Sequence, residues 1–177
     1  MLFREQVKKK AITFSYDDGV VQDIRLIELL NKYGLKCTFN LNSELLSKKG
    51  MLIREGKRIA HYKIHTEDVK HIYEGHEVAV HTLTHPNLTQ CDDKEIIRQV
   101  EADRLNLSEL VEYEVVGMAY PCGGVNNDER VATGIKEKTG VEIKGNINFG
   151  ENYTPAMIKT ENKEIQNVNC YIGLTLE

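Results

Sequence analysis

The chain has 177 residues, a length that suits one domain with a sizeable core. Its hydrophobic content of 41% and its mixed charges are typical of a globular protein and exclude a disordered chain. The net charge of −4 argues against nucleic acid or an anionic membrane as the partner.

Neither an export signal nor cross-linking cysteines are predicted. Basic residues occur among the first ten positions, but no apolar run of signal-peptide length follows them. No stretch is long enough to cross a membrane, so we expect a soluble, cytoplasmic chain. The cysteines form no close pair, which favours reduced thiols over a zinc knuckle or a disulfide framework. They are Cys37, Cys91, Cys122 and Cys170.

The first predicted strand ends in two carboxylates. Apolar residues alternate over residues 12–16, as in a strand with one buried face, and Asp17, Asp18 and Gly19 follow directly. Neighbouring side chains at a strand end point in different directions, so one carboxylate can bind a metal while the other accepts a proton. An ordinary Asp-Gly turn is the simpler alternative for this stretch.

Periodicity and turn residues predict the next elements. Apolar positions at helical spacing predict a helix over 21–33, and a mostly apolar run predicts a strand over 37–41. Asn40 and Asn42, at the end of that strand, would cap a turn or contact substrate hydroxyls, and the turn is favoured. Residues 43–62 are polar and contain a Lys-Lys-Gly turn, so we expect an excursion over the mouth of the site, in the form of a small hairpin.

Three histidines in or near this excursion lack ligand-like spacing. They are His61, His65 and His71, and we interpret them as surface residues. A short helix over 66–73, with Thr66 as its N-cap, is predicted to follow.

A second apolar strand, Val78–Val80, leads into two histidines four residues apart, His81 and His85. A helix would place both imidazoles on one face, as in zinc-binding helices. Pro86 and the β-branched residues of this stretch favour extended backbone, so we predict a strand end and a tight turn with converging imidazoles. Two surface histidines are the alternative. His76, before the strand, is not a predicted ligand.

The later elements alternate between helix and strand. A long helix over 93–113 begins at Asp92, a strand over 115–119 follows, and a helix over 128–138 comes next. Between the last two lie residues 120–124, Tyr-Pro-Cys-Gly-Gly, whose glycines let the backbone approach a ligand closely. This alternation predicts a parallel α/β architecture.

Two of these strands end in residues that bind metals. Asp17 and Asp18 follow one strand and His81 follows another, and functional residues of parallel α/β proteins gather at the carboxyl ends of strands. Two imidazoles and one carboxylate make a three-ligand set with one position open for water, which is the pattern of catalytic zinc sites.

Three motifs together resemble the polysaccharide deacetylase family, the NodB-homology domain of the carbohydrate esterases. Residues 15–19, S-Y-D-D-G, resemble its first motif, usually T-F-D-D-G, and residues 81–85, H-T-L-T-H, fit its second, H-[ST]-x-x-H. Residues 119–123, A-Y-P-C-G, lie where R-x-P-[YF]-G is expected. The resemblance covers approximately residues 10–140. It implies a single α/β domain, an incomplete (β/α) barrel one or two units short of the closed form.

The resemblance also implies a reaction, the metal-dependent removal of N-acetyl groups from a carbohydrate substrate. Asp18, His81 and His85 would hold one divalent metal, with zinc preferred and cobalt, nickel or iron as alternatives. Asp17 would act as general base on the attacking water. The backbone amide of Cys122 would stabilise the oxyanion.

The chain departs from the family pattern at several positions. Ala119 stands where the family has an arginine that orients the base carboxylate, and Cys122 replaces the usual aromatic residue. The family's last-strand histidine, which protonates the leaving amine, has no counterpart, because no histidine follows His85. Residues 141–177 show no clear strand–helix period, so we expect that they do not complete the barrel.

Several explanations of these departures stay open from the sequence. The chain is truncated or shifted in reading frame after about residue 140, or another group supplies the acid, or the chain does not turn over substrate. The alternative function is accordingly a catalytically impaired relative that binds metal or glycan. A third option is a structural domain whose histidines bind nothing.

Overall fold

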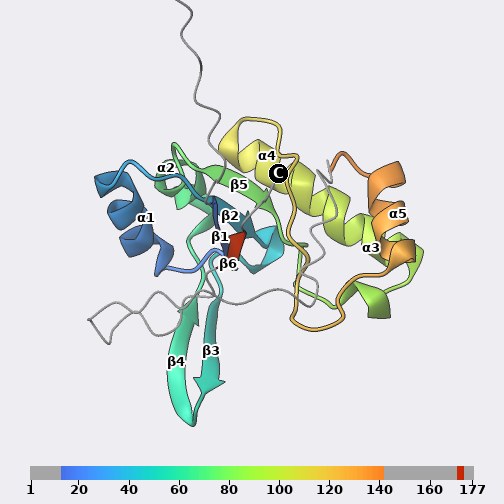
Figure 1. Cartoon of the computed structure of the whole chain (residues 1–177), viewed down its shortest axis with the longest axis horizontal. Helices are drawn as coiled ribbons and strands as arrows, with labels where there is room; N and C mark the ends of the chain where they lie inside the picture. Colours follow the sequence, from blue (N-terminus) through green and yellow to red (C-terminus); the bar gives the residue numbers. More distant parts are fainter. Residues whose placement is uncertain (1–12, 142–170, 174–177) are drawn as a thin grey trace, which may run out of the picture.

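A computed structural model describes residues 13–141 and 171–173. Its centre is a four-stranded sheet with the order β5-β2-β1-β6 (Figure 1). Strands β1, β2 and β5 run parallel, whereas β6 pairs antiparallel with β1. The strands are β1 (Thr13–Asp17), β2 (Thr38–Leu41), β5 (Glu77–Val80) and β6 (Tyr171–Gly173).

The register of the sheet brings the ends of its parallel strands together. Asp17 of β1 lies beside Asn40 of β2, and Leu41 of β2 lies beside Val80 of β5. Strands β2 and β5 are buried over most of their length, as central parallel strands are. The residues that directly follow β1 and β5 therefore meet at one edge of the sheet.

Helices cover the sheet and complete its core. In the view of Figure 1, α1 lies to the left of the sheet and α3, α4 and α5 lie to its right. Ile27 and Leu30 of α1 share one hydrophobic core with Val100 and Leu107 of the long helix and Ile135 of α5. The helices are α1 (Asp23–Lys32), α3 (Asp93–Ile97), a π-helical turn (Arg98–Ala102), α4 (Asp103–Val111) and α5 (Glu129–Lys138).

The long helix matches its prediction at the start and differs in the middle. Its N-cap is Asp92, whose Oδ1 accepts a hydrogen bond from the backbone N–H of Glu95 at 2.8 Å. The side chain of Glu95 does not return to the cap, because it pairs with Arg98 at 2.7 Å. The turn over 98–102 is π-helical, and Glu112 ends the helix with φ of 60°. Helices α1 and α5 confirm the predictions for 21–33 and 128–138 within two residues at each end.

The excursion after β2 is a two-stranded hairpin, as predicted. Strands β3 (Lys49–Arg54) and β4 (Lys57–Tyr62) pair antiparallel and project from the body as an arm (Figure 1). Glu55 and Gly56 form the two-residue loop, with φ of 51° and 73°. Positive φ at both positions is typical of a type I′ turn, whose twist suits a hairpin.

Two predicted elements differ from the structure. The segment 115–119 is not a full strand; it pairs with β5 through a single bridge, in which Val80 N–H donates to Gly117 O and Ala119 N–H to Val80 O, both at 2.9 Å. The segment 66–73 is a 3₁₀ turn (Thr66–Asp68) followed by α2 (Val69–Ile72). The N-cap of the 3₁₀ turn is His65, and Thr66, the predicted N-cap, is the first residue of the turn.

Some expectations for the ends of the chain fall outside the described residues. Of residues 141–177, the structure describes only Val141 and β6. Strand β6 is an antiparallel edge strand that the sequence pattern did not predict. Cys91 and Cys122 are free thiols, as expected, and Cys170 lies outside the described residues. Within the described part of the chain, every helix is too short or too polar to span a bilayer.

Candidate metal centre

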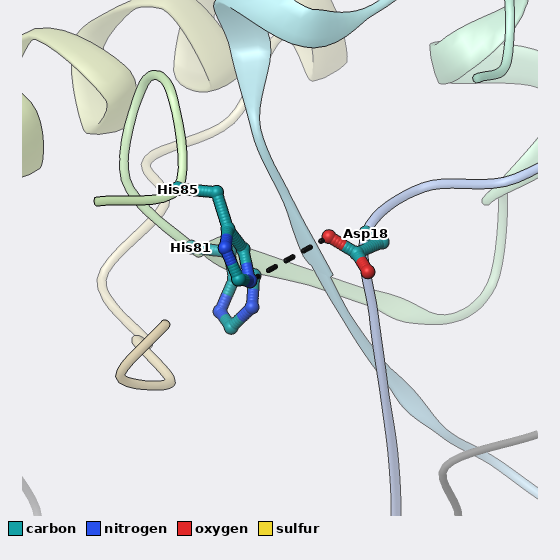
Figure 2. Close-up of side chains that lie close together, drawn as sticks. All are labelled: Asp18, His81 and His85. Carbon is teal, nitrogen blue, oxygen red and sulfur yellow. Dashed lines mark ion pairs between the residues drawn. The ribbon is translucent and has the colours of Figure 1, made fainter. Parts of the chain in front are cut away.

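The three predicted metal ligands meet at the carboxyl edge of the sheet. Each of Asp18, His81 and His85 offers one ligand atom, and these atoms lie within 4.8 Å of one another. In Figure 2 Asp18 faces both imidazoles from the end of β1, and His85 Nε2 lies 3.8 Å from Asp18 Oδ1. Two ligand atoms bound to one tetrahedral zinc are about 3.4 Å apart. The donor types and their spacing therefore fit an ion of this kind.

The backbone around this cluster is unusual. Four residues other than glycine have left-handed φ there: Asp18 (83°), Thr82 (69°), His85 (62°) and Cys122 (68°). Each such residue raises the energy of the fold by on the order of 1–3 kcal/mol, and such residues cluster at functional sites. The conformation turns the side chains of Asp18 and His85 toward a common point, so the strain supports a functional role for this edge.

His81 is held as metal-binding imidazoles are held. Its side chain is buried, and its Nδ1 lies 2.9 Å from the carbonyl oxygen of Ala119. A carbonyl only accepts, so the proton sits on Nδ1 and the lone pair of Nε2 is available to a metal. The short bridge between β5 and residues 117–119 thus fixes the tautomer of His81.

His85 has a different outer neighbour. Its Nε2 faces Asp18, while its Nδ1 lies 3.7 Å from the thiol of Cys122. Thr82 shapes the turn, because its Oγ1 accepts a hydrogen bond from His85 N–H at 3.1 Å. Burial lowers the pKa of His85, and the neighbouring His81 lowers it further, so the neutral, metal-binding form is favoured. Burial also raises the pKa of the Cys122 thiol.

Asp17 is held by Asn40, a residue interpreted from the sequence as a turn cap. Asn40 is 1% exposed, and its Nδ2 donates to Asp17 Oδ1 at 2.7 Å and to Ser15 Oγ at 2.8 Å. The turn interpretation was therefore wrong, because the side chain points along the sheet edge toward its pairing partner. The sequence did carry a signal, since Asp17 and Asn40 both lie at the ends of predicted strands, where functional side chains of parallel sheets gather.

Lys63 lies at the candidate site, although sequence reasoning missed it. It is 7% exposed, and its Nζ donates to the backbone carbonyl of Asp18 at 2.6 Å and lies 3.2 Å from Asp18 Oδ1. Burial raises the pKa of Asp18, but Lys63 and the nearby histidines more than offset this, so the pKa is lowered overall. Burial lowers the pKa of Lys63, and Asp18 opposes that shift.

His61 is not the remote surface residue that its spacing suggested. Its Nε2 lies 3.5 Å from Asp18 Oδ2, and its side chain is 23% exposed. The prediction failed because β4 folds back against the end of β1, a contact that no local spacing reveals. His65 and His71 are exposed as predicted, and His76 is buried against Phe39 with its Nε2 3.1 Å from Asn31, away from the site.

Buried polar side chains hold the start of the histidine loop from behind. Asn42 Nδ2 donates to the carbonyls of His81 and Thr82 at 2.6 and 2.9 Å. Asp103 Oδ2 accepts from His81 N–H at 3.1 Å, and its Oδ1 accepts from Ser43 N–H at 2.7 Å. Burial raises the pKa of Asp103 to about 7, although these hydrogen bonds lower it.

The π-helical turn holds the rest of the loop. The backbone carbonyl of Gln99 accepts from Leu83 N–H at 3.0 Å, and its side-chain oxygen accepts from Thr84 N–H at 3.0 Å. Its Nε2 donates to Thr84 Oγ1 at 2.9 Å. A π turn changes the carbonyl pairing within a helix, which suits a helix that must bind a loop.

The family follows from comparison with known proteins. A sequence model of the polysaccharide deacetylase family matches residues 4–141. The chain belongs to the polysaccharide deacetylase family. Its fold is the polysaccharide deacetylase fold, present here as a partial α/β unit.

Each of the relatives described below matches this chain over only part of its own length. The peptidoglycan-N-acetylglucosamine deacetylase PgdA of Listeria monocytogenes is 26% identical over 120 residues, 66% of this chain and 22% of the relative. The chain thus spans about a fifth of that curated relative. Streptococcus pyogenes deacetylase PplD, solved with acetate, superimposes with a TM-score of 0.57 at 18% identity, over 71% of this chain and 52% of that one.

A pseudoenzyme of the same family has the same fold. BA3943 of Bacillus anthracis superimposes with a TM-score of 0.54 at 21% identity, over 72% of this chain and 40% of that one. At these identities the solved structures show a common fold and no more. Activity in this polysaccharide deacetylase family member must therefore be argued from its own residues.

Proposed function

We propose that this chain is a metal-dependent hydrolase that removes N-acetyl groups from a carbohydrate, built on an incomplete (β/α) barrel. The observation that carries the proposal is the convergence of Asp18, His81 and His85 within 4.8 Å. Zinc is the proposed metal, because nitrogen and oxygen donors in an open three-ligand set suit it. A relative named as a peptidoglycan-N-acetylglucosamine deacetylase makes N-acetylglucosamine polymers the first substrates to test.

Asp17 is the proposed general base. When bound, the metal supplies a Lewis acid that lowers the pKa of water from about 15.7 toward ~7. Asn40 fixes Asp17 Oδ1, so Oδ2 is the oxygen positioned to take a proton. Asp18 and Asp17 leave the strand in different directions, which lets one hold the metal and the other accept the proton.

Cys122 is proposed to contribute its backbone amide to the oxyanion. Its thiol lies 3.7 Å from His85 Nδ1 and 3.6 Å from His85 O, so its backbone lies beside the site. Its left-handed φ of 68° follows Pro121 and sets the direction of its amide. One such donor is worth on the order of 10²–10³ in rate.

Lys63 is proposed to replace the missing arginine of the third motif. Its ammonium is attracted to Asp17 as well as to Asp18, and it is almost fully buried. Lys63, which directly follows β4, would supply the cation that Ala119 cannot supply at the third motif.

The second candidate is an impaired relative that binds metal or glycan without turnover. The given sequence offers no histidine after His85 for the role of protonating the leaving amine. A family member called a pseudoenzyme shares the fold. This candidate predicts a metal-binding chain that releases no acetate.

Acetate release separates the two candidates. The assay uses oligomers of N-acetylglucosamine with added zinc or cobalt, and compares the chain with Asp17→Asn. We expect acetate release that depends on metal and falls at least 10²-fold in Asp17→Asn, in line with the loss of a general base. Metal binding without acetate would establish the impaired relative instead, and activity unchanged in Asp17→Asn would remove the base assignment.

A further inference from the structure

We propose that the β3–β4 hairpin is a binding arm for an acidic N-acetylated glycan, which lies along one face of the hairpin and leads into the metal centre. This inference rests on the proposed function and adds the charge class of its substrate. The face, named here the His61 face, comprises Gly50, Leu52, Arg54, Lys57, Ile59 and His61.

Charge on the hairpin is opposite to that of the rest of the chain. Residues 48–63 contain six Lys or Arg and one acidic residue, Glu55, for a net charge of +5. The remaining sequence has 17 basic and 26 acidic residues, for a net charge of −9. Such a local concentration of one sign attracts an oppositely charged ligand, although the whole chain is acidic.

The register assigns each residue of the arm to one of two faces. Side chains alternate along a strand, and directly paired residues share a face. Gly50 pairs with His61, Leu52 with Ile59, and Arg54 with Lys57, which defines the His61 face. The opposite face contains Lys49, Met51, Ile53, Arg58, Ala60 and Tyr62, and Lys49 Nζ lies 5.9 Å from the ring centre of Tyr62.

The His61 face is continuous with the metal centre. His61 Nε2 lies 3.5 Å from Asp18 Oδ2, and Lys63, two residues further on, lies 3.2 Å from Asp18 Oδ1. From Lys57 to Lys63 the strand spans roughly 20 Å, at about 3.3 Å per residue. A glycan on this face would therefore extend over several sugar units from the hairpin tip to the site of hydrolysis.

The chemistry of this face fits an acidic sugar chain. Arg54 and Lys57 are exposed at the tip, and a guanidinium binds a carboxylate or phosphate through two parallel hydrogen bonds. Leu52, 36% exposed, and Ile59 form an apolar middle on which the C–H side of a sugar ring can lie. Gly50 keeps the surface low, since a Cβ there would be 3.1 Å from His61 O.

The test compares two oligosaccharides and two double variants. The probes are hyaluronan hexasaccharide, which alternates glucuronate with N-acetylglucosamine, and neutral chitohexaose, and the readout is the dissociation constant by calorimetry. Arg54→Gln with Lys57→Gln removes two cations from the His61 face. Lys49→Gln with Arg58→Gln removes the same charge from the opposite face and serves as the control.

The two faces should respond differently. We expect hyaluronan hexasaccharide to bind more tightly than chitohexaose. Its affinity should fall about tenfold in the His61-face variant, because two charge contacts are lost. The opposite-face variant should stay within about twofold. Equal weakening by both variants, as general attraction to an acidic polymer or membrane surface would give, overturns the proposal. Equal affinity for the two probes overturns it too.

The same samples keep this inference separate from the proposed function. Binding is measured without turnover, while acetate release from chitohexaose reports the deacetylase activity. Face-specific binding of the acidic probe without acetate release would support the arm and contradict the activity. Acetate release without face-specific binding would support the activity and contradict the arm.

Discussion

Asp17 is held by the side-chain amide of Asn40. Asn40 Nδ2 lies 2.7 Å from its Oδ1. We expect Asn40→Ala to lower kcat by about 10- to 100-fold, because the base loses its orientation. Zinc affinity should stay unchanged, because the Asn40 side chain bonds to none of the three ligands, and the Asn40 carbonyl that accepts from Asp18 N–H at 2.9 Å is kept in alanine. Steady-state kinetics and zinc titration together measure this.

Asn42 is the matched comparison for Asn40. It is also 1% exposed, but it binds the carbonyls of His81 and Thr82. Asn42→Ala should therefore weaken zinc binding first. If Asn40→Ala weakened zinc as much as Asn42→Ala does, the assignment of Asn40 to the base would be wrong.

Lys63 sets the charge around Asp18. A cation 3.2 Å from Asp18 Oδ1 opposes a second cation at the same carboxylate. We expect Lys63→Met to bind zinc roughly 10- to 100-fold more tightly, since two like charges in a partly buried site repel by about 1–3 kcal/mol. The metal-free variant should be less stable, because Asp18 loses its partner.

The same variant has a clear control. Lys63→Arg keeps the positive charge and should keep the zinc affinity of the unchanged chain within a few-fold. Thermal unfolding with and without zinc gives both quantities. Zinc affinity that is equal in the Met and Arg variants would show that the ammonium does not govern the site.

Single residues differ in how far the sequence predicts them. Asp18, His81 and His85 were predictable, because each directly follows a strand or lies in a tight turn with fixed spacing. Lys63 and His61 were not, since their place depends on how the hairpin folds back on β1. Alternation along β4 and the residue that follows it puts the two on one face, but only the tertiary contact determines what that face meets.

Among the elements, the long helix holds the histidine loop, residues 81–85, through hydrogen bonds. Its π-helical turn places Gln99 against Leu83 and Thr84, and Asp103 against His81 N–H. Gln99 and Asp103 are buried polar groups inside a helix that sequence periodicity predicts as ordinary core packing. The pattern could predict the helix but not the π turn, because one extra residue in a turn barely changes the apolar period.

Asp103 makes the stability of the chain depend on pH. Burial raises its pKa to about 7 from 3.8, so between these values the unfolded chain has lost a proton that the folded chain keeps. The free energy of unfolding should therefore fall with rising pH across this range and level off above it. Relative to Asp103→Asn, the unchanged chain should lose stability from about pH 4 to about pH 7.

Urea unfolding of the metal-free chain at several pH values measures this effect. Asp23, whose pKa burial also raises to about 7, is present in both proteins and cancels in the comparison. A stability difference between the two proteins that does not vary with pH would mean that Asp103 is ionised in the folded state. Its hydrogen bonds to Ser43 and His81 would then outweigh its burial.

At the scale of the whole molecule, the parallel sheet explains why distant motifs meet. Strands β1, β2 and β5 are adjacent and end at one edge, so residues 17–18, 40–42 and 81–85 come together. Strand–helix alternation was enough to predict this arrangement. It was not enough to predict the antiparallel β6 or the short pairing of 115–119, because both depend on long-range contacts of weakly patterned segments.

We propose above all that Asp18, His81 and His85 form one metal site. Zinc content of the purified full chain after zinc is added and excess removed tests it directly, beside the double variant His81→Ala with His85→Ala. We expect about one tightly held ion per chain, absent from the double variant. No bound ion in the unchanged chain, or the same ion content in both, would contradict it.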